Sequence, residues 1–212
     1  MIHFLKPAFF LLICLLHKFF PGAGLPVLFF HSVDESGSVI SISRERFQRF
    51  IKYFHSQGYT TLSLNEFKNY LTNKSFKKDD KKILITFDDG YKNNIAAADI
   101  LIKYNFRALI FVSTAYIGGV NSFCKKDVPA LPMMNAGEIQ SLVKRGIEFG
   151  AHGHTHADLP GLNAGALMYE IMESKRILEE YTAKPVDSFC YPRGKVRKNV
   201  IRALERSGFK IA

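Results

Sequence analysis

Two adjacent carboxylates, Asp88 and Asp89, follow an apolar run at residues 83–87 and precede Gly90. The run favours a buried parallel strand, and functional groups of α/β folds usually lie where such strands end. Adjacent residues of an extended chain point to opposite faces, so the two carboxylates are expected to differ in role, one binding a metal and the other handling protons. The alternative interpretation is a plain turn, because Asp-Gly is a common turn dipeptide.

Three of the seven histidines lie within five residues, directly after an expected strand. His152 and His156 are four residues apart, a spacing that lets both imidazoles face one point. With one carboxylate of residues 88–89 they form a His2Asp set that leaves coordination positions open, as a catalytic metal site requires. His154 could take the place of either neighbour. Asp158 could accept an imidazole proton or cap the following turn.

A third polar cluster, at residues 191–194 (Tyr-Pro-Arg-Gly), ends a further expected strand. Gly194 permits an unusual backbone angle and the close approach of a ligand, so the amide of Arg193 could point into the site. Taken alone, Pro-Arg-Gly indicates only a turn.

Strands and helices alternate along the chain, which predicts βα units and a parallel sheet or barrel. The expected strands are 26–32, 59–62, 83–87, 107–113, 147–151, 186–191 and a start at 209–212. The expected helices are 44–57, one from 63 or 65 to 71, 93–104, one from 135 or 136 to 145, 163–181 and 196–207. Residues 116–132 lack periodicity and are predicted to form a long functional loop. A complete (β/α)8 barrel takes about 250 residues, so a truncated or irregular barrel fits this chain better.

Composition limits the class of protein. The 212 residues, 47% of them hydrophobic, suit one domain with one core. Cys14, Cys124 and Cys190 are widely spaced without a CxxC pair, which argues against a disulfide framework and a thiolate zinc site. The net charge of +10 permits an anionic partner, such as an envelope polymer, a lipid surface or nucleic acid. No nucleic-acid-binding motif accompanies it, and the lysine-rich residues 73–82 are expected to form a solvated loop.

Residues 1–24 differ from the rest of the chain. They combine an early lysine, an apolar run at 7–16 and small residues at 21–24, a pattern that resembles a signal peptide or short membrane anchor. The run is shorter than the roughly 20 residues that span a bilayer. The alternative is an amphipathic helix lying on a membrane or on the domain. We therefore expect a signal-like or membrane-associated segment at 1–24 and the folded domain at 25–212.

Three motifs, in this order and at these separations, resemble the NodB-type polysaccharide deacetylases, carbohydrate esterase family four: TFDDG at 86–90, HGHTH at 152–156 and YPRG at 191–194. PVLFFHS at 26–32 and EIMESKRILE at 170–179 also look like that family. The resemblance covers about residues 25–212.

The resemblance implies a distorted, C-terminally incomplete (β/α)7 barrel and a metal-dependent hydrolase that removes acetyl groups from N-acetylated sugars. It implies zinc as the metal, with Co2+, Ni2+ or Fe2+ as alternatives, and water activated by that metal attacks the acetamide carbonyl. The roles it implies are general base for Asp88, metal ligand for Asp89, His152 and His156, backbone oxyanion donor for Arg193, and substrate contact for Tyr191, Pro192 and Gly194.

The chain departs from the family pattern in two ways. The pattern continues to a Leu-x-x-His motif whose histidine serves as general acid, and no such residue follows Gly194. Cys190 replaces an arginine that many members use to orient the base. Losing a general acid costs about 10²- to 10⁴-fold in rate. Two alternatives therefore stand beside the deacetylase: a catalytically impaired carbohydrate-binding domain, and an amidohydrolase acting on a small amide.

The resemblance also implies a partner and a location. The partner is an N-acetylated polysaccharide or oligosaccharide of the cell envelope or the extracellular space, and nucleic acid is not expected. Peripheral membrane association is compatible with residues 1–24. The protein is expected to be secreted or attached to the envelope, the alternative being membrane association on the cytoplasmic face.

Overall fold

The computed structural model describes residues 24–73, 80–124 and 128–212. The signal-like segment and most of the lysine-rich loop lie outside these residues, so both remain predictions. Across the described ranges, no helix has the length and apolar character needed to cross a bilayer.

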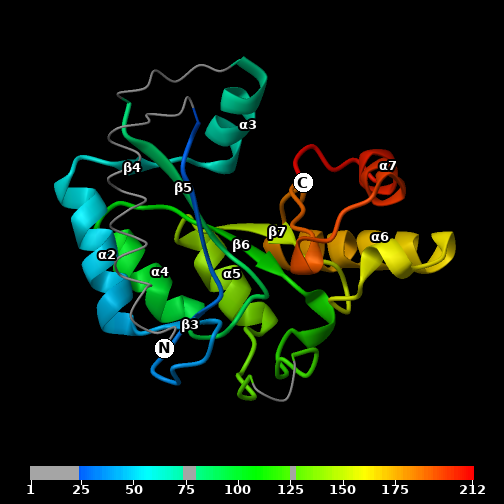
Figure 1. Cartoon of the computed structure of the whole chain (residues 1–212), viewed down its shortest axis with the longest axis horizontal. Helices are drawn as coiled ribbons and strands as arrows, with labels where there is room; N and C mark the ends of the chain where they lie inside the picture. Colours follow the sequence, from blue (N-terminus) through cyan, green and yellow to red (C-terminus); the bar gives the residue numbers. More distant parts are fainter. Residues whose placement is uncertain (1–23, 74–79, 125–127) are drawn as a thin grey trace, which may run out of the picture.

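A parallel sheet forms the centre of the fold (Figure 1). Its main strands, in spatial order, are β1 (Val27–Phe30), β5 (Lys82–Phe87), β6 (Leu109–Val112) and β7 (Glu148–Ala151). A short strand, β4 (Thr60–Thr61), pairs with the start of β5. Every one of these pairings is parallel, which confirms the prediction from strand–helix alternation.

Beyond β7 the parallel pairing continues only as isolated bridges, from Ala151 to Phe189 and from Ser188 to Ile211. The expected strand at 186–191 is thus wrong as a regular strand, and residues 209–212 contribute one bridge. Pro185 and Pro192 flank the first segment, and proline has no N–H to donate to a ladder. The described strands form an open, barrel-like sheet. A separate parallel pair, β2 (Ser32–Val33) with β3 (Ser41–Ile42), was not predicted.

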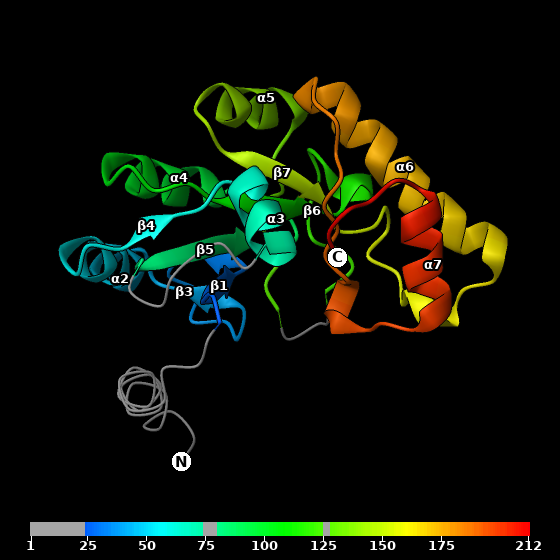
Figure 2. The same cartoon turned by 90° about the horizontal axis from the view of Figure 1, so that it is seen from above.

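Helices cover the outer face of the sheet, and Figure 2 shows α4, α5 and α6 in one layer along β5, β6 and β7. The helices are α2 (Arg44–Ser56), α3 (Leu64–Asn73), α4 (Asn94–Lys103), α5 (Ala136–Lys144), α6 (Ala164–Thr182) and α7 (Lys198–Arg206). All six lie where the sequence predicted a helix. Four begin at side-chain caps: Ser43 for α2, Ser63 with Glu66 for α3, Asn135 with a capping box for α5, and Asn163 for α6. Each such cap stabilises its helix by about 1 kcal/mol.

The two faces of the sheet pack against different elements. Ile110 and Val112 of β6 point outward into the main core under the helices. Leu109 and Phe111, on the other face, pack with Leu64 at the start of α3. The Leu64 N–H donates to Glu148 Oε2 at 2.8 Å, so α3 lies across the inner face and is tied to the start of β7. Both faces of the sheet are therefore covered. The polar residues at the C-terminal ends of the strands remain available to form the site.

Gly150 of β7 fixes the spacing at this edge. A Cβ placed there would lie 2.6 Å from the ring of Phe111 and 2.6 Å from the hydroxyl of Ser188. Only glycine allows β7 to approach both neighbours this closely. The strand end that carries His152 is thereby held against the segment that carries Cys190.

Candidate active site

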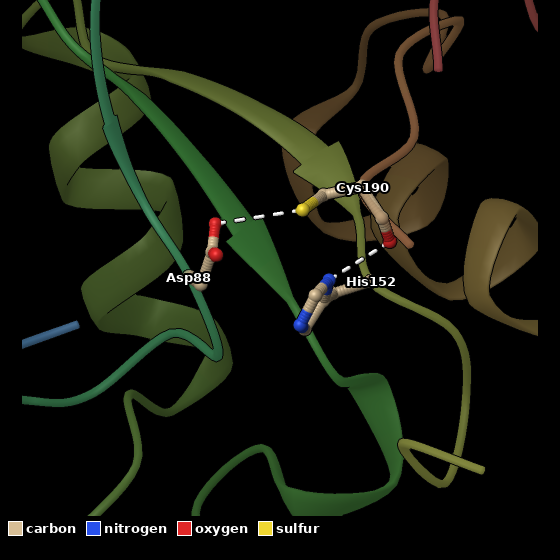
Figure 3. A group of neighbouring side chains, drawn as sticks. All are labelled: Asp88, His152 and Cys190. Carbon is tan, nitrogen blue, oxygen red and sulfur yellow. Dashed lines mark hydrogen bonds between the residues drawn. The ribbon is translucent and has the colours of Figure 1, made fainter. Parts of the chain in front are cut away.

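The three polar clusters of the sequence meet at the C-terminal edge of the sheet. Asp88 and Asp89 follow β5, and His152 follows β7. Cys190 lies on the segment bridged to β7, and its backbone N–H donates to Ala151 O at 2.8 Å. Figure 3 shows Asp88, His152 and Cys190 converging from these elements. Parallel strands place their carboxyl ends at one edge, so residues about 100 positions apart become neighbours.

Asp89, His152 and His156 form a buried set of possible metal ligands. Asp89 Oδ1 lies 3.4 Å from His152 Nε2 and 3.4 Å from His156 Nε2. The three residues are 3%, 2% and 8% exposed, and in the part of the chain that the structure describes Asp89 Oδ1 has no hydrogen-bond partner. Bonds of about 2.0–2.1 Å to a tetrahedral zinc would separate such atoms by about 3.4 Å. The spacing of these three atoms fits a divalent cation.

The protonation of the imidazoles agrees with this fit. His152 Nδ1 lies 2.8 Å from the carbonyl oxygen of Cys190, which can only accept, so Nδ1 donates and the Nε2 lone pair faces Asp89. Burial lowers the pKa of His152 to about 3 and that of His156 to about 4, so both rings are neutral at pH 7. The contacts with Asp89 are therefore not ion pairs. The Asp89 carboxylate and the His152 lone pair face each other beside Nε2 of His156, an arrangement that a cation stabilises.

The carboxyl group of Asp89 is both buried and charged at neutral pH. Burial raises the pKa of Asp89 to about 6. At pH 7 the group is still mostly ionised, so the set offers one negative charge and two neutral nitrogens. This mixture of oxygen and nitrogen donors suits zinc, cobalt, nickel or iron.

The backbone of the site is strained. Among the described residues, six that are not glycine have positive φ, and three of them belong to this site: Asp89 at 73°, His156 at 57° and Arg193 at 57°. Such angles cost about 1–3 kcal/mol each and persist only where the surroundings enforce them. The backbone therefore departs from regular geometry at the three residues that it directs toward the site.

Glu170 of α6 holds the histidine loop, and sequence analysis did not assign it a role. Its carboxylate is 5% exposed. Oε2 accepts from the backbone N–H groups of His154 at 2.9 Å and Thr155 at 2.8 Å, and Oε1 accepts from Thr155 Oγ1 at 2.5 Å. The only signal in the sequence was the resemblance of residues 170–179 to the family.

Two alternatives left open by the sequence are now decided. His154 does not join the set with Asp89: its Nδ1 pairs with Thr114 Oγ1 at 2.9 Å and its ring packs edge-on against Tyr169. Asp158 forms an ion pair with Lys195 and contacts no imidazole. It occupies the cap position of a short turn, without a side-chain capping hydrogen bond.

Asp88 lies beside the ligand set. Its Oδ1 accepts from the Cys190 thiol at 3.6 Å. Burial raises the pKa of Asp88, and the nearby His31 opposes the rise. A raised pKa brings a carboxylate closer to the range in which it exchanges protons at neutral pH. His31 follows β1 and was predicted only as the end of a strand, so its electrostatic effect on Asp88 is new.

The third cluster forms the turn Pro192–Gly194. The Tyr191 ring packs against Phe189 with centroids 5.8 Å apart, Pro192 is buried, and Gly194 N–H donates to Tyr191 O at 2.9 Å. The guanidinium of Arg193 is near enough to help lower the pKa of His156, after the larger effect of burial. The turn therefore borders the ligand set.

The predicted long loop also reaches the site. The ring of Phe123 stacks on His156 with centroids 4.4 Å apart and an interplanar angle of 23°. Tyr116 packs against Phe123 at 4.7 Å. Phe123 therefore covers one side of the second imidazole, and Tyr116 supports Phe123.

Fold and site together define a class of protein. A carboxylate next to a His2Asp set, at the C-terminal edge of a parallel α/β sheet, is typical of hydrolases that activate water with a divalent cation. A sequence model of the polysaccharide deacetylase family matches residues 76–212. The chain belongs to the polysaccharide deacetylase family.

Similar proteins come from several bacteria. A candidate polysaccharide deacetylase, YxkH of Bacillus subtilis (strain 168), is 28% identical over 190 residues, which are 89% of this chain and 63% of YxkH. The poly-beta-1,6-N-acetyl-D-glucosamine N-deacetylase of Staphylococcus aureus (strain MRSA252) is 26% identical over 196 residues, covering 86% of this chain and 64% of that protein. The chain thus spans less than two thirds of the length of these relatives.

The fold has a close counterpart among solved structures. A polysaccharide deacetylase from Bacillus cereus superposes with a TM-score of 0.72 at 27% identity, over 88% of this chain and 56% of the other. This confirms the predicted fold class, with the described strands leaving the barrel open.

Proposed function

We propose that this protein removes N-acetyl groups from amino sugars of a cell-envelope or extracellular polysaccharide. The observation that carries the proposal is the partnerless Asp89 Oδ1, buried and 3.4 Å from two neutral imidazole nitrogens, with a second carboxylate beside it. Asp89, His152 and His156 would hold the divalent cation, and zinc is the proposed metal. When bound, the cation supplies Lewis acidity that lowers the pKa of water and polarises an amide carbonyl.

The remaining roles follow from position. Asp88 accepts the proton of the attacking water, as its half-buried carboxylate with a raised pKa allows. The backbone N–H of Arg193 stabilises the oxyanion, an interaction worth about 3–4 kcal/mol per donor in other enzymes. Tyr191, Pro192 and Gly194 contact the substrate beside it.

His31 supplies the proton that the leaving amine needs. It lies close enough to both Asp88 and Asp89 to lower the pKa of each, against the larger effect of burial. We expect His31→Gln to lower turnover while zinc stoichiometry is unchanged.

The substrate class is inferred from the relatives. The Staphylococcus aureus relative is named for the deacetylation of poly-β-1,6-N-acetylglucosamine. That supports an N-acetylglucosamine polymer as the substrate here. It also supports a secreted or envelope-attached location, with residues 1–24 as the targeting or membrane-associated segment and 25–212 as the deacetylase domain.

The test is acetate release from β-1,6- and β-1,4-linked N-acetylglucosamine oligomers by the full chain, stripped of metal and then reloaded with zinc. We expect release only after reloading. Asp88→Asn should lose about 10²- to 10⁴-fold in turnover and still bind zinc stoichiometrically. Asp99→Asn, a matched change at a surface residue paired with Arg145, should leave turnover unchanged.

Three results would count against the proposal. Release that does not depend on metal, or full activity of Asp88→Asn, would contradict the assigned roles. Zinc binding without release would support the alternative of an impaired carbohydrate-binding domain. Cleavage of small amides with oligosaccharides ignored would support an amidohydrolase.

A further inference from the structure

We propose that Asp88, His152 and Cys190 form a second cation position, which overlaps the first and which a thiol-seeking cation occupies in an inhibitory mode. One ligand atom from each residue lies within 4.8 Å of the others. Figure 3 shows the thiol and the carboxylate directed toward each other, with the imidazole beside them. The sequence argued against a site built from several thiolates, and the fold brings a single thiol to an imidazole and a carboxylate.

The spacing of the atoms fits a bound metal. Asp88 Oδ1 and Cys190 Sγ are 3.6 Å apart. Bonds of about 2.3 Å to sulfur and about 2.1 Å to oxygen, at a tetrahedral angle, separate the two ligand atoms by about 3.6 Å. A cation can therefore replace the thiol hydrogen bond without a large movement of either side chain.

The two cation positions exclude each other. Nδ1 of His152 donates to the Cys190 carbonyl, which leaves Nε2 as the single lone pair of that ring. The same Nε2 faces Asp89 in the first position. One nitrogen lone pair serves one cation, so the metal sits either with Asp89 and His156 or with Asp88 and Cys190.

The chemistry of the ligand atoms determines which cation each of the two positions prefers. The first position offers one carboxylate and two imidazoles. The second position offers one carboxylate, one imidazole and one sulfur atom. Thiolate sulfur favours soft cations such as Cd2+. Without a cation the thiol holds its proton and donates it to Asp88. Binding breaks the S–H bond, forms the metal–sulfur bond and releases the proton to the buffer, which only a cation with high affinity for thiolate can drive.

Occupancy of the second position stops the reaction, and this consequence rests on the proposed function. A carboxylate that binds a cation no longer accepts the proton of water. Asp88 then cannot act as base, and His152 is withdrawn from the first position. The binding itself does not depend on which reaction the protein catalyses.

The experiment isolates the thiol of Cys190. Residues 14 and 124 carry the other two cysteines, so the reference protein is the full chain with Cys14→Ser and Cys124→Ser. Its partner carries Cys190→Ser as well, and a second partner carries Cys190→Ala. Metal-free samples are titrated with CdCl2, and the ultraviolet charge-transfer absorption of a cadmium–thiolate bond is recorded. Zinc stoichiometry shows that each variant retains the first position.

We expect the absorption to rise to a stoichiometric end point in the reference protein and to be absent from both partners. In zinc-loaded samples, the CdCl2 concentration for half-inhibition, relative to each variant's own activity, should rise by roughly 10- to 100-fold without Cys190, as is typical when support for a metal is lost. No absorption in the reference protein, or equal inhibition in all three, would overturn the second position. Absorption from Cys190 in a protein that releases no acetate would sustain the second position and refute the proposed deacetylase.

Discussion

Asp89, His156 and Arg193 share a left-handed backbone conformation that L-amino acids avoid. At each position the chain has just left a strand or loop and turns sharply. At Asp89 this turn aims one carboxylate at the imidazoles, while the carboxylate of its neighbour Asp88 contacts the thiol of Cys190. The left-handed backbone at Asp89 therefore places the adjacent carboxylates of Asp88 and Asp89 in different surroundings.

Arg193 allows the backbone role to be separated from the side-chain role. Arg193→Ala keeps the N–H and removes the guanidinium, so acetate release should stay within about threefold of wild type, since an oxyanion donor is worth far more than that. Arg193→Gly should behave the same and be more stable than Arg193→Ala by about 1 kcal/mol, because glycine adopts φ of 57° without strain. Steady-state rates and chemical denaturation measure both effects. A loss of about 100-fold in Arg193→Ala would instead assign catalysis to the guanidinium.

At the scale of elements, the histidine loop depends on a helix that contributes no ligand. Residues 152–158 form neither regular helix nor strand. The backbone N–H groups of His154 and Thr155 donate to Glu170, near the start of α6, and α6 packs against β7. A cap at Asn163 fixes where α6 begins and hence where Glu170 points. The path of the loop that leads to His156 thus depends on the docking of α6.

We therefore expect Glu170→Ala to weaken zinc binding by about 10- to 100-fold, the usual effect of losing a partner that supports metal ligands. Glu170→Gln should retain most of the affinity, because its amide oxygen can still accept both backbone N–H groups. Glu180→Ala, at an exposed glutamate of the same helix, is the control. Competition with a chelator gives the dissociation constants. Unchanged affinity in Glu170→Ala would show that the loop holds its shape without α6.

At the scale of the molecule, the site joins the ends of β5 and β7 and the segment after α6. These parts are distant in sequence and meet only in the folded chain. The unfolded chain does not preserve the set, so metal binding adds directly to folding stability. The buried charge of Asp89, whose Oδ1 has no hydrogen-bond partner among the described residues, opposes that stability.

Zinc at 100 times its dissociation constant should stabilise the protein by about 2.7 kcal/mol. For a domain of this size that corresponds to a rise in Tm of roughly 5–10 °C. Thermal unfolding followed by circular dichroism, with zinc and with chelator, measures the difference. Asp89→Ala should show no response to zinc and should be no less stable than the metal-free wild type. A zinc-dependent rise that persists in Asp89→Ala would place the metal elsewhere.

The sequence by itself determined most of the helices and strands, and also the strand ends at which the polar clusters lie. Apolar runs and helical spacing are local properties, so β5, β6, β7 and all six helices follow from short stretches of chain, as do the caps at Ser43 and Asn135. The polar clusters after residues 87, 151 and 190 were visible because charged and polar residues interrupt apolar strands.

Only the tertiary structure decided what those clusters contact. Strand order and the docking of α3 and α6 depend on contacts between distant residues, which no periodicity reports. That is why the sequence did not show Glu170 beneath the histidine loop, the electrostatic effect of His31 on Asp88, or the Cys190 carbonyl that sets the tautomer of His152. It also left His154 open as a ligand, because sequence spacing cannot tell which of two nearby imidazoles turns toward Thr114 and away from Asp89.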